Sequence, residues 1–212
     1  MQPNSLTDDQ RTDEWFKARL GKATASRFKD IMITIKSGEA AGRKNYRAEL
    51  VAERLTGTKE ETWTSAAMQW GIDNEPLAAL RYELLSGNEV QECGFYAHQS
   101  LQAGASPDGL VGDDGLIEIK CPNTATHIDT LKRQDIPYQY YWQVMGQLWI
   151  TGRKWCDFIS FDPRMPENAQ IFITRIERDE SKIKQLEEQV TTFLREVAHD
   201  EQFIKSYERA SL

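Results

Sequence analysis

The spacing of apolar residues changes near Val90, and this change limits what the chain can fold into. Before it, helical spacing predicts helices over residues 13–20, 24–35 and 46–56, and Asn74-Glu75-Pro76 opens a further helix that stops at Gly87. After it, short apolar runs between turns predict strands over residues 90–97, 110–111, 116–121, 155–162 and 170–177. This order of elements indicates a mixed α/β fold.

Two helices complete the predicted order. Residues 137–150 form an aromatic-rich helix, and an amphipathic helix runs from Asp179 to about residue 200. We expect a single domain over residues 1–212. It divides into a helical part at about 13–87, a sheet core at about 88–178 and a C-terminal helix at about 179–200. Residues 37–42 predict a mobile loop.

Composition excludes several classes of protein. No apolar run approaches the ~18 residues that span a bilayer, and the polar start MQPNSLTDDQ has no pattern of a secretory signal. The three cysteines are scattered and form no CxxC pair, which argues against a disulfide framework, a zinc site or an iron–sulfur cluster. We therefore expect a protein of the reducing cytoplasm.

The charge of the chain is uneven. The whole chain has a net charge of −7, which argues against a histone-like nucleic-acid binder. Residues 15–47 nevertheless hold nine basic and two acidic residues, so this basic segment is net +7. Such a distribution favours an enzyme that holds a polyanion at one place and repels it elsewhere. The alternative is that the basic residues form an ordinary solvated helix face.

A predicted hairpin brings two carboxylates together. Gly112-Asp113-Asp114-Gly115 is a strong turn signal between Ser106-Pro107-Asp108-Gly109-Leu110 and Glu118-Ile119-Lys120. The fold-back places Asp108 near Glu118. Alternation along a strand turns Glu118 and Lys120 to one side and Ile119 to the core. Because Glu118 stands between two isoleucines, we expect it to be half-buried.

This arrangement suits phosphodiester hydrolysis. Asp108, Glu118 and the backbone carbonyl of Ile119 could share a Mg²⁺ ion, which takes oxygen ligands and keeps several waters. Lys120 would lie beside a metal-bound water and orient it or help to deprotonate it. The alternative is structural, since Pro-Asp-Gly is a common turn and Glu-x-Lys is common on solvated strands. A carboxylate–ammonium row in an apolar strand is costly to desolvate, which favours the functional interpretation.

The chain resembles the phage lambda-type alkaline exonucleases of viral recombination, within the restriction-endonuclease-like nuclease superfamily. The resemblance rests on six blocks in the same order over about residues 13–178. They are Trp15 with Ala18-Arg19-Leu20-Gly21 and Thr24-Ala25-Ser26; Trp70-Gly71 with Glu75; Ser106 to Leu110; Glu118-Ile119-Lys120-Cys121-Pro122; Gln143-Val144 with Trp149; and Asp162-Pro163-Arg164-Met165. It implies a central mixed sheet flanked by helices, and a helical part that binds the DNA end.

The resemblance also implies roles for particular residues. Asp108, Glu118 and the carbonyl of Ile119 would bind two Mg²⁺ ions, with Mn²⁺ as a substitute, and Lys120 would serve the attacking water. Glu75 and Gln143 would complete the catalytic site. Without the resemblance, Glu75 is explained by the dipole of an early helix turn, and Gln143 by a satisfied polar position on a core helix.

A second set of residues is implied to bind the DNA end. Arg19, Ser26 and Ser106 would form a pocket for the terminal 5′-phosphate, which suits an Arg fork and hydroxyl groups. Met68 would be an apolar wedge at the terminal base pair. The alternative is that Met68 is an ordinary residue of the hydrophobic core. A basic residue that the family places after the catalytic Lys has no clear counterpart, which leaves His127 as a candidate replacement.

The implied function is a Mg²⁺-dependent 5′→3′ exonuclease of duplex DNA. It would degrade the 5′-phosphorylated strand to mononucleotides and leave a 3′ single strand for recombination by annealing. The resemblance further implies a ring-shaped homotrimer, a single-strand annealing partner, and a phage or prophage protein in the bacterial cytoplasm. Two alternatives stay open: a structure-selective endonuclease on the same core, and a catalytically silent DNA-binding subunit.

Overall fold

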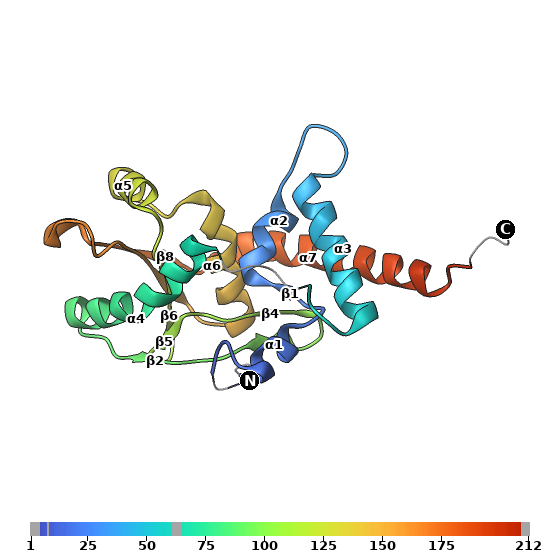
Figure 1. Cartoon of the computed structure of the whole chain (residues 1–212), viewed down its shortest axis with the longest axis horizontal. Helices are drawn as coiled ribbons and strands as arrows, with labels where there is room; N and C mark the ends of the chain where they lie inside the picture. Colours follow the sequence, from blue (N-terminus) through green and yellow to red (C-terminus); the bar gives the residue numbers. More distant parts are fainter. Residues whose placement is uncertain (1–4, 8, 61–64, 209–212) are drawn as a thin grey trace.

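A five-stranded sheet forms the centre of the protein. The structure is a computed structural model that describes residues 5–7, 9–60 and 65–208 (Figure 1). The strands stand in the order β2 (Val90–Gln91), β5 (Gly109–Val111), β6 (Gly115–Lys120), β7 (Trp155–Phe161) and β8 (Ile171–Glu177). β6 and β7 are parallel and the other neighbours are antiparallel. The expected mixed α/β fold is therefore confirmed.

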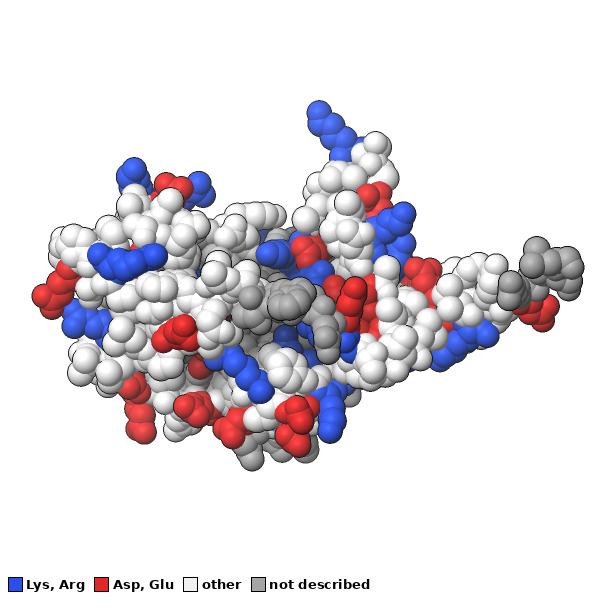
Figure 2. All heavy atoms as spheres, in the orientation of Figure 1, with Lys and Arg blue, Asp and Glu red and all other residues white. Residues whose placement is uncertain are grey.

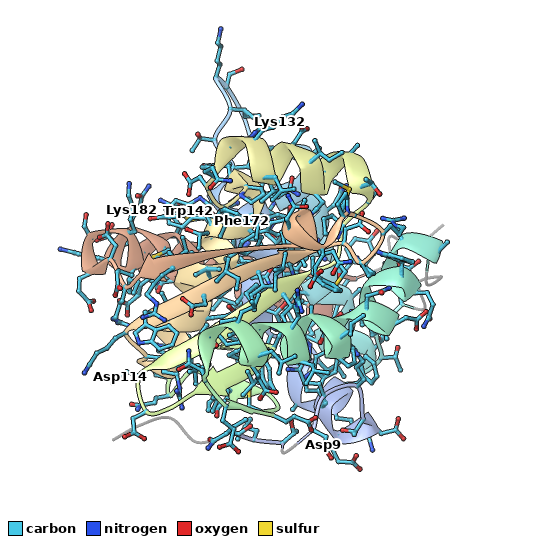
Figure 3. All side chains as sticks on the ribbon, turned by 90° about the vertical axis from the view of Figure 1, so that its left-hand side faces the viewer. Asp9, Asp114, Lys132, Trp142, Phe172 and Lys182 are labelled. Atoms are coloured by element: carbon cyan, nitrogen blue, oxygen red, sulfur yellow. The ribbon has the colours of Figure 1, made fainter. Side chains whose placement is uncertain are left out.

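Helices cover both faces of this sheet. Leu116 of β6 belongs to a core shared with α6 (Tyr138–Thr151) and α7 (Glu180–Lys205). Its neighbour Ile117 belongs to a second core, shared with Ala78 and Tyr82 of α4 (Ala66–Ser86). Figure 3 shows α4 lying across the sheet. Because side chains alternate along a strand, β6 sends one set of residues towards α6 and the other towards α4.

The N-terminal part packs beside the sheet, against α6 and α7. It contains α1 (Asp13–Arg19), β1 (Ala23–Thr24), a 3₁₀ turn at Ala25–Arg27, α2 (Phe28–Met32) and α3 (Ala41–Thr56). β1 forms a second, three-stranded sheet with β4 (Ala103–Ala105) and β3 (Tyr96–Ala97), in the order β1-β4-β3. A further helix, α5 (Thr124–Arg133), contacts β7.

Several expectations about secondary structure are wrong. Residues 24–35 form a strand end, a 3₁₀ turn and the short α2 rather than one helix, because Ala23 and Thr24 pair with β4. Residues 90–97 split into β2 and β3, which belong to different sheets. α3 already begins at Ala41, inside the expected loop, and α7 continues to Lys205 instead of ending near residue 200. Tertiary pairing outweighs local pattern at the first two places.

An ion-pair network joins α3 to the end of α7. Arg43 and Arg47 both bind Glu39 and Glu196, and Arg47 also reaches Asp200 at 2.8 Å. Part of the basic segment is therefore neutralised by acids from the C-terminal helix. Figure 2 shows basic side chains on the protrusion formed by α3 and the loop before it, and several acidic side chains along the lower edge.

Among the described residues, no helix combines sufficient length with sufficient apolar character to cross a bilayer.

Candidate active site

The β5–β6 hairpin places Asp108 beside Glu118, as the sequence predicts. Gly109 pairs with Ile117, and the backbone N–H of Asp108 donates to the Ile117 carbonyl at 3.2 Å. The Asp108 carboxylate in turn accepts a hydrogen bond from the N–H of Ile119 at 2.6 Å. Both carboxylates therefore lie at the β5–β6 hairpin. A backbone hydrogen bond fixes the orientation of Asp108.

Glu118 is completely buried rather than half-buried, with 0% of its surface exposed. Its two carboxylate oxygens accept hydrogen bonds from the side-chain amides of Gln143 and Gln147 on α6. Lys120 forms an ion pair with the same carboxylate and keeps 26% of its side chain exposed. The predicted common orientation of Glu118 and Lys120 is thus confirmed, and the charge of Glu118 has the partners that a buried carboxylate needs.

Electrostatics in this cluster favour an additional cation. Burial, and then the neighbouring Glu118 carboxylate, raise the pKa of Asp108 well above its usual range. For Lys120, burial acts in the opposite direction, but the carboxylates of Glu118 and Asp108 outweigh it and raise the pKa. The ammonium group is therefore held in its charged form. Asp108 can be ionised beside Glu118 only at a cost that positive charge would relieve.

Glu75 reaches the same region from α4, but not from an early helix turn. The helix begins at Ala66, capped by the Ser65 side chain, and continues through Pro76 to Ser86. The predicted start at Asn74 is wrong, so the helix dipole does not account for Glu75. Its carboxylate binds Arg11 at 2.6 Å. Glu75, Asp108 and Ile119 line a common cavity of about 530 Å³.

The donor set at this site fits Mg²⁺ better than a softer metal. Within the described ranges, no group of three or more His, Cys, Asp or Glu side chains forms a ready metal cage. The hairpin offers two carboxylates instead, Asp108 and Glu118, and Ile119 also lines the cavity. Mg²⁺ prefers oxygen, takes few protein ligands and keeps its own waters.

Arg19 and Ser106 meet in a smaller cavity next to this cluster. The Arg19 guanidinium donates to the Ser106 hydroxyl at 3.1 Å, and the Trp15 indole N–H donates to the same hydroxyl at 2.9 Å. Arg19 also stacks on the Trp15 ring, 4.1 Å from its centre. The cavity has a volume of about 120 Å³, and Ser26, Gln143 and Gln147 contribute to its lining. The three predicted pocket residues are thus brought together.

Arg19 is a cation that lacks a carboxylate partner in the described part of the chain. Its burial lowers its pKa to about 10, and Tyr46 and Glu53 oppose this shift only in part. At neutral pH the guanidinium stays charged. Burying a charge without a counter-ion is costly, so an anion entering the cavity would be stabilised.

Gln147 is a site residue that the sequence reasoning missed. It binds Glu118 through its amide nitrogen, while its amide oxygen is buried without a hydrogen-bond partner among the described residues. The available signal was its position: Gln143 and Gln147 lie one turn apart on a helix rich in aromatic and aliphatic residues, so they share a face. This face connects the Glu118 carboxylate with the Arg19 cavity.

Two further sequence candidates lie outside both cavities. His127 is fully buried and binds the Ser160 hydroxyl and the Ala169 carbonyl, both at 2.8 Å. It does not line the Arg19 cavity, so it does not replace the missing basic residue. Met68 lies in the first turn of α4 and is 56% exposed, so it is not a core residue.

A known protein family matches the part of the chain that holds the candidate site. The YqaJ-like viral recombinase domain matches residues 14–154, which is more than half of the chain. The chain belongs to this family. The recombinase domain covers α1 to α6 and every predicted site residue from Arg19 to Gln143. No curated protein has a sequence that matches the chain significantly.

Solved structures of similar proteins agree with this family assignment. An alkaline exonuclease from Laribacter hongkongensis is 50% identical, with a TM-score of 0.86 over 92% of this chain and 96% of that chain. Another structure of that protein is a complex with dAMP. A phage-related exonuclease from Haemophilus somnus 129PT is 16% identical and shares the fold, with a TM-score of 0.70 over 87% of this chain and 95% of that chain. The protein is thus an exonuclease.

Proposed function

We propose that this exonuclease is Mg²⁺-dependent and digests duplex DNA in the 5′→3′ direction, releasing mononucleotides from the 5′-phosphorylated strand. The observation that supports this most directly is the position of Gln147 between the Glu118 carboxylate and the Arg19 cavity. Gln147 binds Glu118 and also lines the cavity of Arg19 and Ser106. A 5′-phosphate bound at Arg19 would therefore lie next to the carboxylate site. An endonuclease has no use for such an end-binding pocket.

The residues divide the chemistry between them. Asp108, Glu118 and the Ile119 carbonyl would hold the divalent cation, with Glu75 and Gln143 completing the site. A bound cation supplies Lewis-acid stabilisation of charge on phosphate and lowers the pKa of the attacking water. Lys120, held in its charged form, orients that water. Arg19, Ser26 and Ser106 hold the terminal phosphate and set the register of the strand, and Met68 contacts the terminal base pair.

Digestion of linear, nicked and circular duplex DNA in Mg²⁺ tests this proposal. We expect linear 5′-phosphorylated duplex to yield acid-soluble mononucleotides while covalently closed circles persist. Omission of the metal with EDTA present should stop digestion. Circles cut as fast as linear DNA would instead indicate a structure-selective endonuclease, and no cleavage of any substrate would indicate a silent DNA-binding subunit.

Arg19→Ala tests the end-binding pocket. Wild type should prefer 5′-phosphorylated over 5′-hydroxyl ends, because a bidentate guanidinium matches the extra charge of a terminal phosphate. The variant should lose most of this preference and cut in shorter runs, while its dependence on Mg²⁺ stays the same. Arg19→Lys should rescue only in part. The measurement is the ratio of initial rates on the two ends, and an unchanged ratio would remove Arg19 from the pocket.

The proposed assembly is a homotrimeric ring that passes the 3′ strand to a single-strand annealing protein. Two exposed apolar groups lie at opposite ends of the molecule (Figure 1). They are Leu77, Leu80 and Leu84 on α4, and Phe203, Ile204 and Tyr207 at the end of α7. Two different surfaces per subunit are what a closed head-to-tail ring requires.

Light scattering coupled to size exclusion tests the ring. It should report about three times the 24.4 kDa mass of one chain. A monomer throughout the micromolar range would contradict the ring, but would leave the proposed chemistry in place.

A further inference from the structure

The segment before α1 is tied to the hairpin that holds Asp108. We call residues 5–7 and 9–12 the N-terminal strap. The Leu6 N–H donates to the Phe95 carbonyl at 2.7 Å, and the Phe95 N–H donates to the Thr7 hydroxyl at 3.0 Å. The Gln10 side chain donates to the carbonyl of Pro107, the residue before Asp108, at 2.6 Å. The strap is thus attached at Phe95 and at the residue that precedes Asp108.

A glycine makes this attachment possible. A Cβ atom at position 94 would lie 2.1 Å from both the carbonyl oxygen and the hydroxyl of Thr7. No real side chain tolerates such a distance, so any other residue at Gly94 would push the strap away. The close approach provides a way to displace the strap without changing any residue in it.

The strap contributes Asp9, Gln10 and Arg11 to the lining of the active-site cavity, and Arg11 pairs with Glu75. The Arg11 guanidinium binds the Glu75 carboxylate at 2.6 Å, and these side chains are 45% and 27% exposed. Arg11 has φ 65°, a left-handed conformation that residues other than glycine rarely adopt. Figure 3 shows the neighbouring Asp9 below α4, the helix that carries Glu75. The backbone thus takes an uncommon conformation where Arg11 reaches the site.

The cavity that Arg11 enters is otherwise acidic. Among the described residues, Arg11 is the only Lys or Arg that lines it. The acidic lining residues are Asp9, Glu75, Glu83, Glu92 and Asp108. A guanidinium is planar and presents its donors in a fixed fork, so it restricts the orientation of a carboxylate more than an ammonium group does. Arg11 therefore restricts the orientation of Glu75 in the cavity that Asp108 also lines.

We propose that Arg11 is a positioning residue of the nuclease site, and that the N-terminal strap holds it there to orient Glu75. This rests on the proposed function, in which Glu75 completes the catalytic site. Arg11 lies before the residues that the recombinase family match covers, 14–154.

A double-mutant cycle tests whether Arg11 acts through Glu75. Arg11→Ala should lower kcat on 5′-phosphorylated duplex about tenfold and leave KM within about twofold. In a Glu75→Gln background, Arg11→Ala should lower kcat less than about twofold, because the effects of substitutions at two coupled residues are not additive. Arg11→Lys should restore part of the loss. Arg195→Ala, an exposed position on α7, is the control and should match wild type.

Binding of Mn²⁺, measured by calorimetry without DNA, gives a second readout. Loss of Arg11 removes a positive charge beside Glu75, so Mn²⁺ should bind as tightly as in wild type or more tightly, although kcat falls. A site that is merely damaged would lose turnover and metal affinity together. Gly94→Ala should reproduce the Arg11→Ala pattern by displacing the strap.

The outcomes separate this proposal from the proposed function. If wild type digests DNA but the Arg11 and Glu75 effects multiply, or if Arg11→Ala loses Mn²⁺ affinity along with kcat, Arg11 is not a positioning residue. If wild type digests no DNA under any metal condition, the proposed function itself is rejected.

Discussion

Glu118→Gln should reduce the nuclease rate on the order of 10³-fold or more, the largest effect that we expect from a single substitution. The change keeps the shape of the side chain but removes a charge from the proposed cation site. It also sets an amide donor against the Gln143 and Gln147 amides and the Lys120 ammonium, which all donate to this carboxylate. Initial rates on 5′-phosphorylated linear duplex measure the effect.

Duplex binding should largely survive in this variant, because the basic segment is unchanged. Asp114→Asn is a matched control: it makes the same change at a 48% exposed carboxylate on the same hairpin, and should retain normal activity. A melting curve separates loss of chemistry from loss of fold. Retention of more than about a tenth of wild-type activity would show that Glu118 is not a metal ligand.

Lys120→Ala should be nearly inactive, with a loss of about 10²–10⁴-fold, the range expected for a group that assists proton movement. The ammonium is held in its charged form next to Glu118 and Asp108, so its removal takes away the group proposed to orient the attacking water. Unlike Glu118→Gln, this variant should still bind Mn²⁺ in calorimetry. Lys154→Ala, at a 69% exposed lysine, is the control.

The two variants therefore differ in metal binding rather than in activity. If Lys120→Ala lost metal affinity and thermal stability together, Lys120 would be a structural counter-ion of buried Glu118. If it kept substantial activity, another group would orient the water.

The sequence was most informative where a local pattern and the tertiary structure agree. Turn residues at Gly112–Gly115 and alternation along β6 sufficed to predict that Asp108 approaches Glu118 and that Lys120 faces the same way. Both depend on the register of one hairpin, which short-range geometry determines. The complete burial of Glu118 is not predictable in this way, because it depends on α6, whose Gln143 lies 25 residues further along the chain.

Other elements could not be predicted because their stability comes from distant partners. β4 is Ala-Gly-Ala, without β-branched residues, and is held by β1 and β3. A Cβ at Gly104 would lie 2.1 Å from the Phe95 ring, so the packing of Phe95 on this strand requires glycine there. Pro76 predicts a helix start, because proline favours the first turn. It lies inside α4 instead, where Ala78 and Tyr82 are buried against the sheet.

The α3–α7 ion pairs change how the salt dependence of DNA binding should be interpreted. The slope of log K against log salt is commonly converted into a number of phosphate contacts. Here, ionic strength also screens the attraction of Arg43 and Arg47 to Glu196, within the protein itself. Part of the measured slope then arises from an intramolecular equilibrium, in which arginines released from α7 become available to the polyanion. A titration of wild type alone would therefore misstate the footprint of the protein on DNA.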